Sequence, residues 1–326
     1  MTELIMPQDG ALVSQKTDVM RLFERDIAKN AWVNMWGSFA SGEEGPLTEP
    51  LPVRFEWKTD ECGAVFALSE DSGFAASVPH RVSGNSAYAE NLLLGKKYYW
   101  KVGNSETRTF VTEDVPPRWI HTTRASNVRD IGGYPALEGR KVRQRMIYRG
   151  TRIFRDGDPS GLKTLRDDLG IVFELDLRSS AEAESYSSRI GGGVRYERIE
   201  SEGYGDFLVL KRNIPKYFAV LTDVSNYPMY IHCAGGADRT GTLVSMILSL
   251  LGVDEETLTR EFECSTLCFP HDHKSRKEEG WREFTAALRI LGGDFGKGIR
   301  KFVLSTGVSE EQIDRLREIL LEPSEI

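Results

Sequence analysis

Ten consecutive residues, His232-Cys-Ala-Gly-Gly-Ala-Asp-Arg-Thr-Gly241, join an apolar segment typical of a strand to a long apolar segment typical of a helix. A loop that ends at a helix N-terminus points several backbone N–H groups inward, and the positive end of the helix dipole adds to their attraction for an anion. Gly235 and Gly236, with the small Ala234 and Ala237, allow such a loop to curl tightly. The stretch therefore predicts a cradle for a phosphate dianion.

Two side chains of this stretch could do chemistry on a bound phosphate. Arg239 has a planar guanidinium that can hold two phosphate oxygens at once, which a lysine cannot imitate. The positive charge of Arg239 and the loop N–H groups also favour the thiolate form of Cys233, which is the nucleophilic form of a cysteine. We therefore predict that a bound phosphate meets a nucleophile in this loop.

The loop resembles the HCxxGxxRTG signature of the cysteine-dependent protein tyrosine phosphatase superfamily, and further segments resemble a bacterial branch of it that includes tyrosine, dual-specificity and phosphoinositide phosphatases. The resemblance covers about residues 120 to 322 and includes a closing pair of helices between Phe295 and Leu321. Its other segments are Ser126-Asn-Val-Arg-Asp-Ile-Gly-Gly-Tyr134, Gly139-Arg-Lys-Val142, Ile147-Tyr-Arg149 and Leu175-Asp-Leu-Arg-Ser179, the last followed by Glu182 or Glu184.

The resemblance implies a role for each residue of the loop. Cys233 would attack phosphorus in line and form a phosphocysteine, while Arg239 and the loop amides would stabilise the equatorial oxygens. Thr240 would hydrogen-bond the sulfur, and His232 would orient the loop. The chemistry requires no metal and no cofactor. The expected substrate-binding residues are Ala234, Gly235, Gly236, Ala237 and Thr240.

A carboxylic acid must also protonate the leaving oxygen and later activate water. Asp238 is the first candidate because the bacterial branch carries an aspartate inside the loop, although a capping role at the helix start is a serious alternative. Asp206 follows the segment 196–199, where related phosphatases keep a mobile acid. Asp176 is the third candidate.

One position departs from the bacterial branch, which usually reads HCxxGKDRTG where this chain has Ala237. A lysine there would add positive charge against a second anionic group on the substrate, so its absence favours a protein tyrosine phosphatase, with dual specificity as an extension. A phosphoinositide or inositol phosphate phosphatase is the alternative. A phosphate-binding module without turnover and a sulfurtransferase are two further hypotheses from other functional classes.

The first third of the chain has a different pattern. Residues 53–57, 64–69, 86–92, 97–104 and 107–112 are β-branched and aromatic runs separated by turn residues, which is typical of a β-sandwich. Leu92 to Val102 and the segment near residue 6 resemble fibronectin type III modules, whereas Asp18 to Pro50 fits that pattern badly. Pro116 and Pro117 favour a linker. We expect an all-β, fibronectin type III-like domain over 1–115 and an α/β phosphatase domain over 116–326, of which residues 119–326 should fold alone and retain catalysis.

The second domain alternates strands with helices, which predicts an α/β fold with a central, mostly parallel sheet flanked by helices. The expected strands are Ile171 to Leu177 and Tyr230 to Cys233. The expected helices are Gly161 to Leu169, Thr240 to Leu251, Glu255 to Ser265, Trp281 to Leu291 and Ser309 to Leu321.

Composition excludes several classes of partner. The net charge is −7, so we expect no nucleic acid to bind, and the absence of a long apolar run predicts no membrane segment.

The four cysteines form no CxxC pair, which favours a reducing, cytoplasmic location. Cys264 and Cys268 are typical of core residues, and a redox partner of Cys233 is the alternative for them. The pair His271 and His273 is more typical of a solvated loop than of a metal site. Expected partners are a phosphorylated protein or a small phosphomonoester, with a protein partner possible through the β domain.

Overall fold

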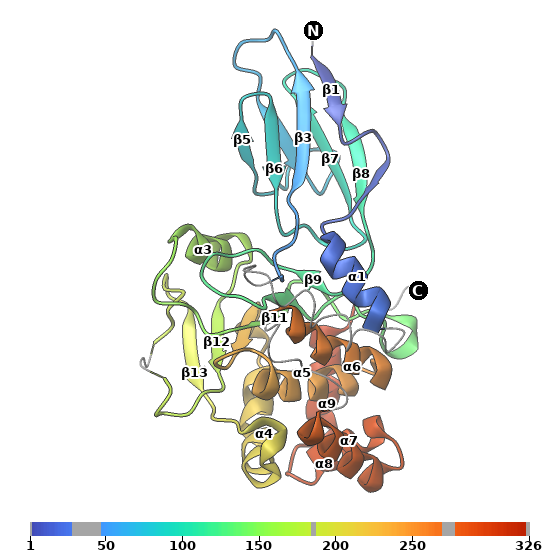
Figure 1. Cartoon of the computed structure of the whole chain (residues 1–326), viewed down its shortest axis with the longest axis vertical. Coiled ribbons are helices and arrows are strands. Elements are labelled where there is room, and N and C mark those ends of the chain that lie inside the picture. The colour runs from blue at the N-terminus through green and yellow to red at the C-terminus, as the bar shows by residue number, and fades with distance from the viewer. Residues whose placement is uncertain (1, 28–46, 184–186, 269–277, 324–326) are drawn as a thin grey trace.

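The computed structural model describes residues 2–27, 47–183, 187–268 and 278–323. Figure 1 shows the chain as two parts stacked along its long axis. Strands β1 to β8 lie at one end, and a mixed sheet with helices α4 to α9 beside it lies at the other.

The N-terminal part contains two antiparallel-rich sheets, with strand orders β1-β3-β6-β5 and β2-β8-β7-β4. Inward residues alternate with outward ones along β3 and β7, as expected for strands with one buried face. Phe55 and Trp100, from opposite sheets, meet edge to face with ring centroids 5.3 Å apart. The strands are β1 (Glu3–Met6), β2 (Ala11–Val13), β3 (Val53–Lys58), β4 (Phe66–Ser69), β5 (Arg81–Ser83), β6 (Ser86–Ala89), β7 (Lys97–Val102) and β8 (Arg108–Thr112).

A helix, α1 (Asp18–Ile27), lies inside the range that the sequence predicted to be all-β. Its buried Met20 and Phe23 pack against Trp119 and against Leu267, which both belong to the C-terminal part. Apolar residues three positions apart on a helix share one face, and here that face covers the C-terminal part of the chain instead of the N-terminal strands. A fragment that starts at residue 119 would expose this cluster, so the expectation that it folds alone loses support.

The C-terminal part is built on one mixed sheet with the order β13-β12-β14-β11-β10-β9. Strands β13, β12, β14 and β11 pair in parallel. Strand β10 pairs antiparallel with β11, and β9 pairs antiparallel with β10. The predicted α/β architecture of this part is confirmed. The strands are β9 (Arg118–Trp119), β10 (Arg129–Asp130), β11 (Ile147–Gly150), β12 (Phe173–Asp176), β13 (Arg195–Arg198) and β14 (Met229–His232).

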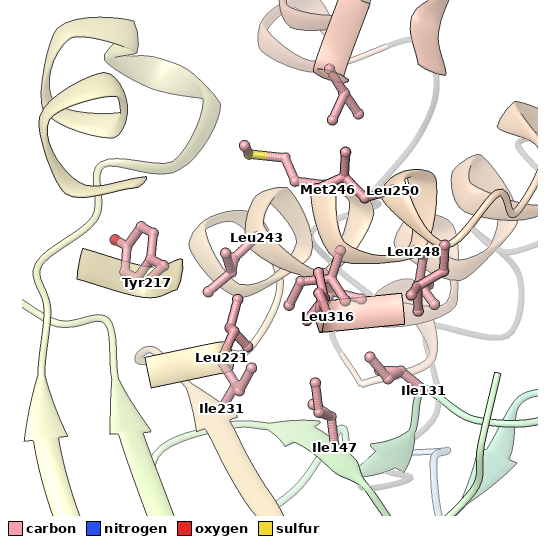
Figure 2. Packing of buried hydrophobic residues seen from close by; sticks show 14 of the residues in the cluster. Ile131, Ile147, Tyr217, Leu221, Ile231, Leu243, Met246, Leu248, Leu250 and Leu316 are labelled. Carbon is pink, nitrogen blue, oxygen red and sulfur yellow. The ribbon is translucent and has the colours of Figure 1, made fainter. Parts of the chain in front are cut away.

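Both faces of this sheet are covered. Met229 and Ile231 of β14 point into the larger core, while Tyr230 between them points into a smaller core on the opposite face, as the two-residue period of a strand requires. In Figure 2, Leu243 lies on the side of α5 that faces Ile231 of the sheet, and Met246 lies on the opposite side of this helix.

The helices mostly begin where the sequence predicted them, and α4 is the long helix that the sequence analysis missed. Pro215 inside α4 argues against a helix by propensity, but the nearby Ile214 and Tyr217 of the same helix are buried in the larger core. The helices are α3 (Ser160–Lys163), α4 (Phe207–Leu221), α5 (Asp238–Leu250), α6 (Glu255–Glu263), α7 (Glu279–Gly292), α8 (Phe295–Leu304) and α9 (Glu310–Leu320). Among the described residues, none of the helices has the length and apolar character needed to cross a membrane.

Polar contacts also join the two parts. The buried Arg118 donates to the carbonyl oxygens of Asn91 and Leu92 at 2.6 and 3.1 Å, and to the carboxylate of Asp130 at 2.7 Å. The side-chain amide of Gln144 exchanges two hydrogen bonds with the backbone of Leu94. The position of the domain boundary stays a prediction, but side chains on both sides of it are buried together.

We predict that Phe23→Ala destabilises the chain by about 3 to 5 kcal/mol, because it empties a buried aromatic site shared by the two parts. The free energy of unfolding in urea would measure the loss. Arg21→Ala, on the exposed face of the same helix, should change this free energy by less than about 1 kcal/mol. A loss for Phe23→Ala as small as that for Arg21→Ala would show that the buried face of α1 contributes little to the stability of the chain.

Candidate active site

Cys233 lies immediately after β14, at the start of the loop that leads into α5. The side chain is buried, and the N–H of Gly236 donates to its Sγ atom at 3.2 Å. Gly236 has a φ of 66°, and a Cβ there would lie 2.2 Å from the carbonyl oxygen of Gly150. Only glycine fits this position, and the tight turn it allows brings a backbone N–H to the sulfur.

The carbonyl oxygens of the loop point away from the sulfur and are held by donors from other elements. The Asn127 side-chain amide donates to the carbonyls of Gly235 and Gly236 at 3.2 and 3.4 Å. The Arg149 guanidinium donates to the carbonyls of Gly236 and Ala237. A peptide unit whose C=O is fixed outward turns its N–H inward. These donors therefore shape the loop as an anion cradle.

Asn127 and Arg149 belong to a fully buried charge network. Glu261 of α6 accepts from Arg129 Nε and from Arg149 Nη1, both at 2.6 Å, while Arg129 Nη1 donates to the Asn127 side-chain oxygen at 2.6 Å. Burial alone would raise the pKa of Glu261, but the charges of the two arginines hold it below its usual value. Burial lowers the pKa of Arg149 to about 10, which leaves it protonated at neutral pH. Two cations thus share one carboxylate behind the loop.

Arg239 lies in the first turn of α5 and pairs with Glu182. Its Nη1 and Nη2 atoms donate to the two carboxylate oxygens at 2.5 and 2.9 Å, and Glu182 also accepts from the N–H of Ser179 at 3.0 Å. The hydrogen bond from Arg239 lowers the pKa of Glu182 to about 2. The Glu182 pair and the nearby Cys233 both raise the pKa of Arg239. The structure thereby identifies Glu182 as the carboxylate of the DLRS…E element that meets the arginine, and Glu184 lies outside the described residues.

His232 lies beneath the loop, fully buried. Its Nε2 atom is 2.9 Å from Glu174 Oε1, and its Nδ1 atom is 3.0 Å from the carbonyl oxygen of Cys233. Burial alone would lower the pKa of His232, but the hydrogen bond and charge of Glu174 raise it. The carbonyl oxygen of Cys233 can only accept, so Nδ1 of His232 donates to it and anchors the backbone at Cys233.

The first candidate acid, Asp238, is the first helical residue of α5 and is partly exposed. Ala237 is the N-cap of this helix and makes no side-chain capping bond, so the capping alternative for Asp238 has no support from the helix start itself. The Asp238 carboxylate instead lies 3.0 Å from the phenolic oxygen of Tyr204, which comes from the 3₁₀ turn η4 (Gly203–Gly205).

The other two candidate acids have structural partners. Asp206 precedes α4, and its carboxylate accepts from the N–H of Val209 at 3.1 Å, which is the geometry of a helix N-cap. Asp176 is fully buried and accepts from Arg178 and from the Tyr196 hydroxyl at 2.8 Å. Burial acts to raise the pKa of Asp176, but its hydrogen bonds with Arg178 lower the pKa overall. A carboxylate held in this way is a poor proton donor.

Two further predicted residues, Ala237 and Thr240, are buried. Thr240 is buried, and its hydroxyl has no hydrogen-bond partner among the described residues, so the expected bond to sulfur is not formed here. Ala237 is only 4 % exposed. A lysine in its place would have to extend from a buried backbone position.

Cys264 and Cys268 were the predicted alternative for a redox partner of Cys233. Burial raises the pKa of Cys264 and of Cys268 to about 12, which opposes the thiolate chemistry that a redox partner of Cys233 would need. His271 and His273 lie outside the described residues. The redox alternative for Cys264 and Cys268 therefore has no support from their pKa values.

Sequence reasoning missed Tyr204, Glu261 and Glu278 as residues near the loop. Glu278 lies 2.7 Å from the same Tyr204 hydroxyl that meets Asp238. Each of the three is far from residues 232–241 in the sequence, and only their burial or their contacts single them out. One signal was present for Glu261: a charged residue at a core-facing position of an amphipathic helix commonly has a buried partner.

The sequence pattern of the Tyrosine phosphatase family matches residues 120–322, which is more than half of the chain and includes the whole loop. The chain belongs to this family. The predicted membership of the cysteine-dependent phosphatase superfamily is thus confirmed, whereas the similarity of the N-terminal part to fibronectin type III modules stays a prediction.

A curated relative and two solved structures are similar to parts of the chain. A Cupriavidus necator protein provisionally named a tyrosine-protein phosphatase is 27% identical; the match covers 42% of this chain and 59% of the relative, so the chain spans about three fifths of that relative's length. The core catalytic domain of the PP-IP phosphatase SIW14 from S. cerevisiae is 18% identical, covering 45% of this chain and 86% of that one, with a TM-score of 0.31. The structure of PTPMT1 in complex with PI(5)P is 14% identical, covering 50% and 96%, with a TM-score of 0.33.

We predict that Glu261→Gln lowers the free energy of unfolding by about 3 to 5 kcal/mol, because it leaves two buried arginines without their counter-charge. Phosphatase activity should fall with it, since Arg149 holds the loop carbonyls. Urea unfolding and phosphate release would measure the two effects. Glu256→Gln, an exposed substitution on the same helix, is the matched control and should cost less than about 1 kcal/mol. A Glu261→Gln variant indistinguishable from this control would contradict the role of the network.

Proposed function

We propose that the chain is a phosphomonoester hydrolase that acts through a phosphocysteine intermediate on phosphotyrosine in proteins, with dual specificity as an extension. One observation carries the proposal: Cys233 lies at the base of a loop whose Gly236 N–H reaches its sulfur, while Arg239 stands in the first turn of the helix that follows. The match to the tyrosine phosphatase family supports the same chemistry.

The geometry supports a two-step reaction. The Cys233 sulfur attacks phosphorus in line, the bond from phosphorus to the leaving oxygen breaks, and Asp238 gives a proton to that oxygen. Water then attacks phosphorus and gives its proton to the Asp238 carboxylate, and the bond to sulfur breaks to release inorganic phosphate. Arg239 and the inward N–H groups stabilise the equatorial oxygens in both steps. Asp238 is our choice of acid because Asp206 caps a helix and Asp176 is held by Arg178.

The substrate class follows from the charges that the loop offers. Ala237 stands where the bacterial branch has a lysine, and its burial leaves no cation at this position for a second anionic group. A substrate with one phosphate on an aromatic ring needs only the cradle and Arg239. This supports phosphotyrosine over polyphosphorylated inositols.

For the N-terminal part we propose a β-sandwich domain that presents a surface to a protein partner. The strand orders of its two sheets and its shared aromatic core support a sandwich. Helix α1 is then an insertion of this domain that packs on the catalytic part.

We predict that Cys233→Ser abolishes release of phosphate from p-nitrophenyl phosphate in the presence of a chelator, because a serine hydroxyl is a poor nucleophile without a strong base. Binding of inorganic phosphate or vanadate should persist. Cys62→Ser replaces an exposed cysteine and should leave the rate unchanged. Turnover by the Cys233→Ser chain would refute the covalent mechanism, and phosphate binding without turnover by the unmodified chain would favour the binding module.

A panel of phosphotyrosine peptides and phosphoinositides should show a higher specificity constant for a phosphotyrosine peptide, by about tenfold or more. Each missing cationic contact to a second phosphate typically forfeits about 1 to 3 kcal/mol. Initial rates of phosphate release would give both constants. A phosphoinositide that outperforms every peptide would reverse the substrate assignment and leave the phosphatase assignment intact.

A further inference from the structure

The phenolic hydroxyl of Tyr204 lies between two carboxyl groups. Its oxygen is 3.0 Å from Asp238 Oδ1 and 2.7 Å from Glu278 Oε1, both within hydrogen-bond distance. Asp238 belongs to the catalytic loop, whereas Glu278 directly precedes α7. Tyr204 therefore connects the proposed general acid to a second acid from a distant segment.

The ring of Tyr204 is held rigidly by aromatic neighbours. Phe262 and Trp281 stack on each other with centroids 4.1 Å apart, and each meets the Tyr204 ring edge to face at about the same distance, 6.2 and 6.1 Å. Gly280 packs so closely that a Cβ there would lie 2.6 Å from the ring. Rings packed in this way fix the direction of the hydroxyl.

One hydroxyl hydrogen cannot serve two acceptors. Burial, the charge of Asp238 and the hydrogen bond with Glu278 all raise the pKa of Tyr204, so the phenol keeps its hydrogen. When Tyr204 donates to Asp238, its oxygen can hydrogen-bond Glu278 only as an acceptor, so Glu278 must carry a proton. When Tyr204 donates to Glu278 instead, Asp238 must carry the proton. Both hydrogen bonds form only when the two carboxyl groups share one acid proton.

We propose that Tyr204 is a positioning residue for the general acid Asp238 and that Glu278, through Tyr204, supplies the proton that the leaving oxygen receives. This inference rests on the proposed phosphatase function. Glu278 gives its proton to the phenolic oxygen while Tyr204 gives its own hydrogen to Asp238, so one proton moves from Glu278 to Asp238 and the phenol is unchanged. The proton that water later gives to Asp238 restores the starting state.

The test measures kcat/KM for a series of aryl phosphates whose leaving groups range from p-nitrophenolate to unsubstituted phenolate. Tyr204→Phe keeps the packed ring and removes only the hydroxyl. We expect it to lower kcat/KM for phenyl phosphate about tenfold to a hundredfold while changing p-nitrophenyl phosphate by a few fold at most, because a good leaving group departs without an acid. Asp238→Asn should show the same dependence on the leaving group, and to a larger extent.

Two variants separate proton supply from structure. Glu278→Gln can still hydrogen-bond Tyr204 but has no acid proton, so it should reproduce the leaving-group dependence of Tyr204→Phe. Tyr217→Phe removes another buried hydroxyl, 3.0 Å from the Glu200 carbonyl, and should leave that dependence unchanged. The inference would be overturned if Tyr204→Phe lowered kcat/KM equally for all substrates of the series. It would also be overturned if Glu278→Gln had the same kcat/KM values as the unsubstituted chain. The proposed function would stand in either case, because the unmodified chain would still turn over every substrate.

Discussion

The planarity of the peptide unit is the constraint on which this structure depends. A loop that turns its N–H groups toward a phosphate must turn the matching carbonyls away from it, and those carbonyls are then buried against the protein. Here Asn127 and Arg149 satisfy them, and Glu261 and Arg129 hold these two donors in turn. The shape of the anion site therefore depends on buried groups that hold the outward carbonyls of the loop.

This requirement explains why distant segments converge behind the loop. Asn127 lies two residues before β10, and Arg129 is the first residue of that strand. Arg149 lies in β11, which pairs with the strand that leads to Cys233, and Glu261 comes from α6. The Arg129 guanidinium also lies over the ring of Trp119, 5.3 Å from its centroid. Trp119 contacts α1, so the N-terminal helix packs on the outer wall of the same network. The boundary between the two parts therefore runs through the structural support of the site.

The local chemistry of the site could be predicted from the sequence, and its long-range support could not. Residues 232–241 are contiguous, so their types and spacing alone predict a nucleophile in an anion cradle, and strand and helix periodicity place the loop between β14 and α5. Tyr204 meets Asp238 across 34 positions of sequence, and no local pattern encodes that contact. Helix α1 was missed for a related reason. Its apolar face packs against residues of the C-terminal part, and helix propensity carries no information about that contact.

The pairing of Arg239 with Glu182 means that a phosphate must compete with a carboxylate of the chain for the same guanidinium. The carboxylate occupies both terminal nitrogens of the guanidinium, and because it is tethered to the chain it competes at a high effective concentration. Binding is then an exchange of one anion for another. A ligand with a single negative charge replaces a carboxylate of the same charge, so the exchange adds little binding free energy. A phosphate dianion brings a second negative charge to the same guanidinium and to the loop amides. The Glu182–Arg239 pair therefore opposes the binding of a monoanion at Arg239 more than that of a phosphate dianion.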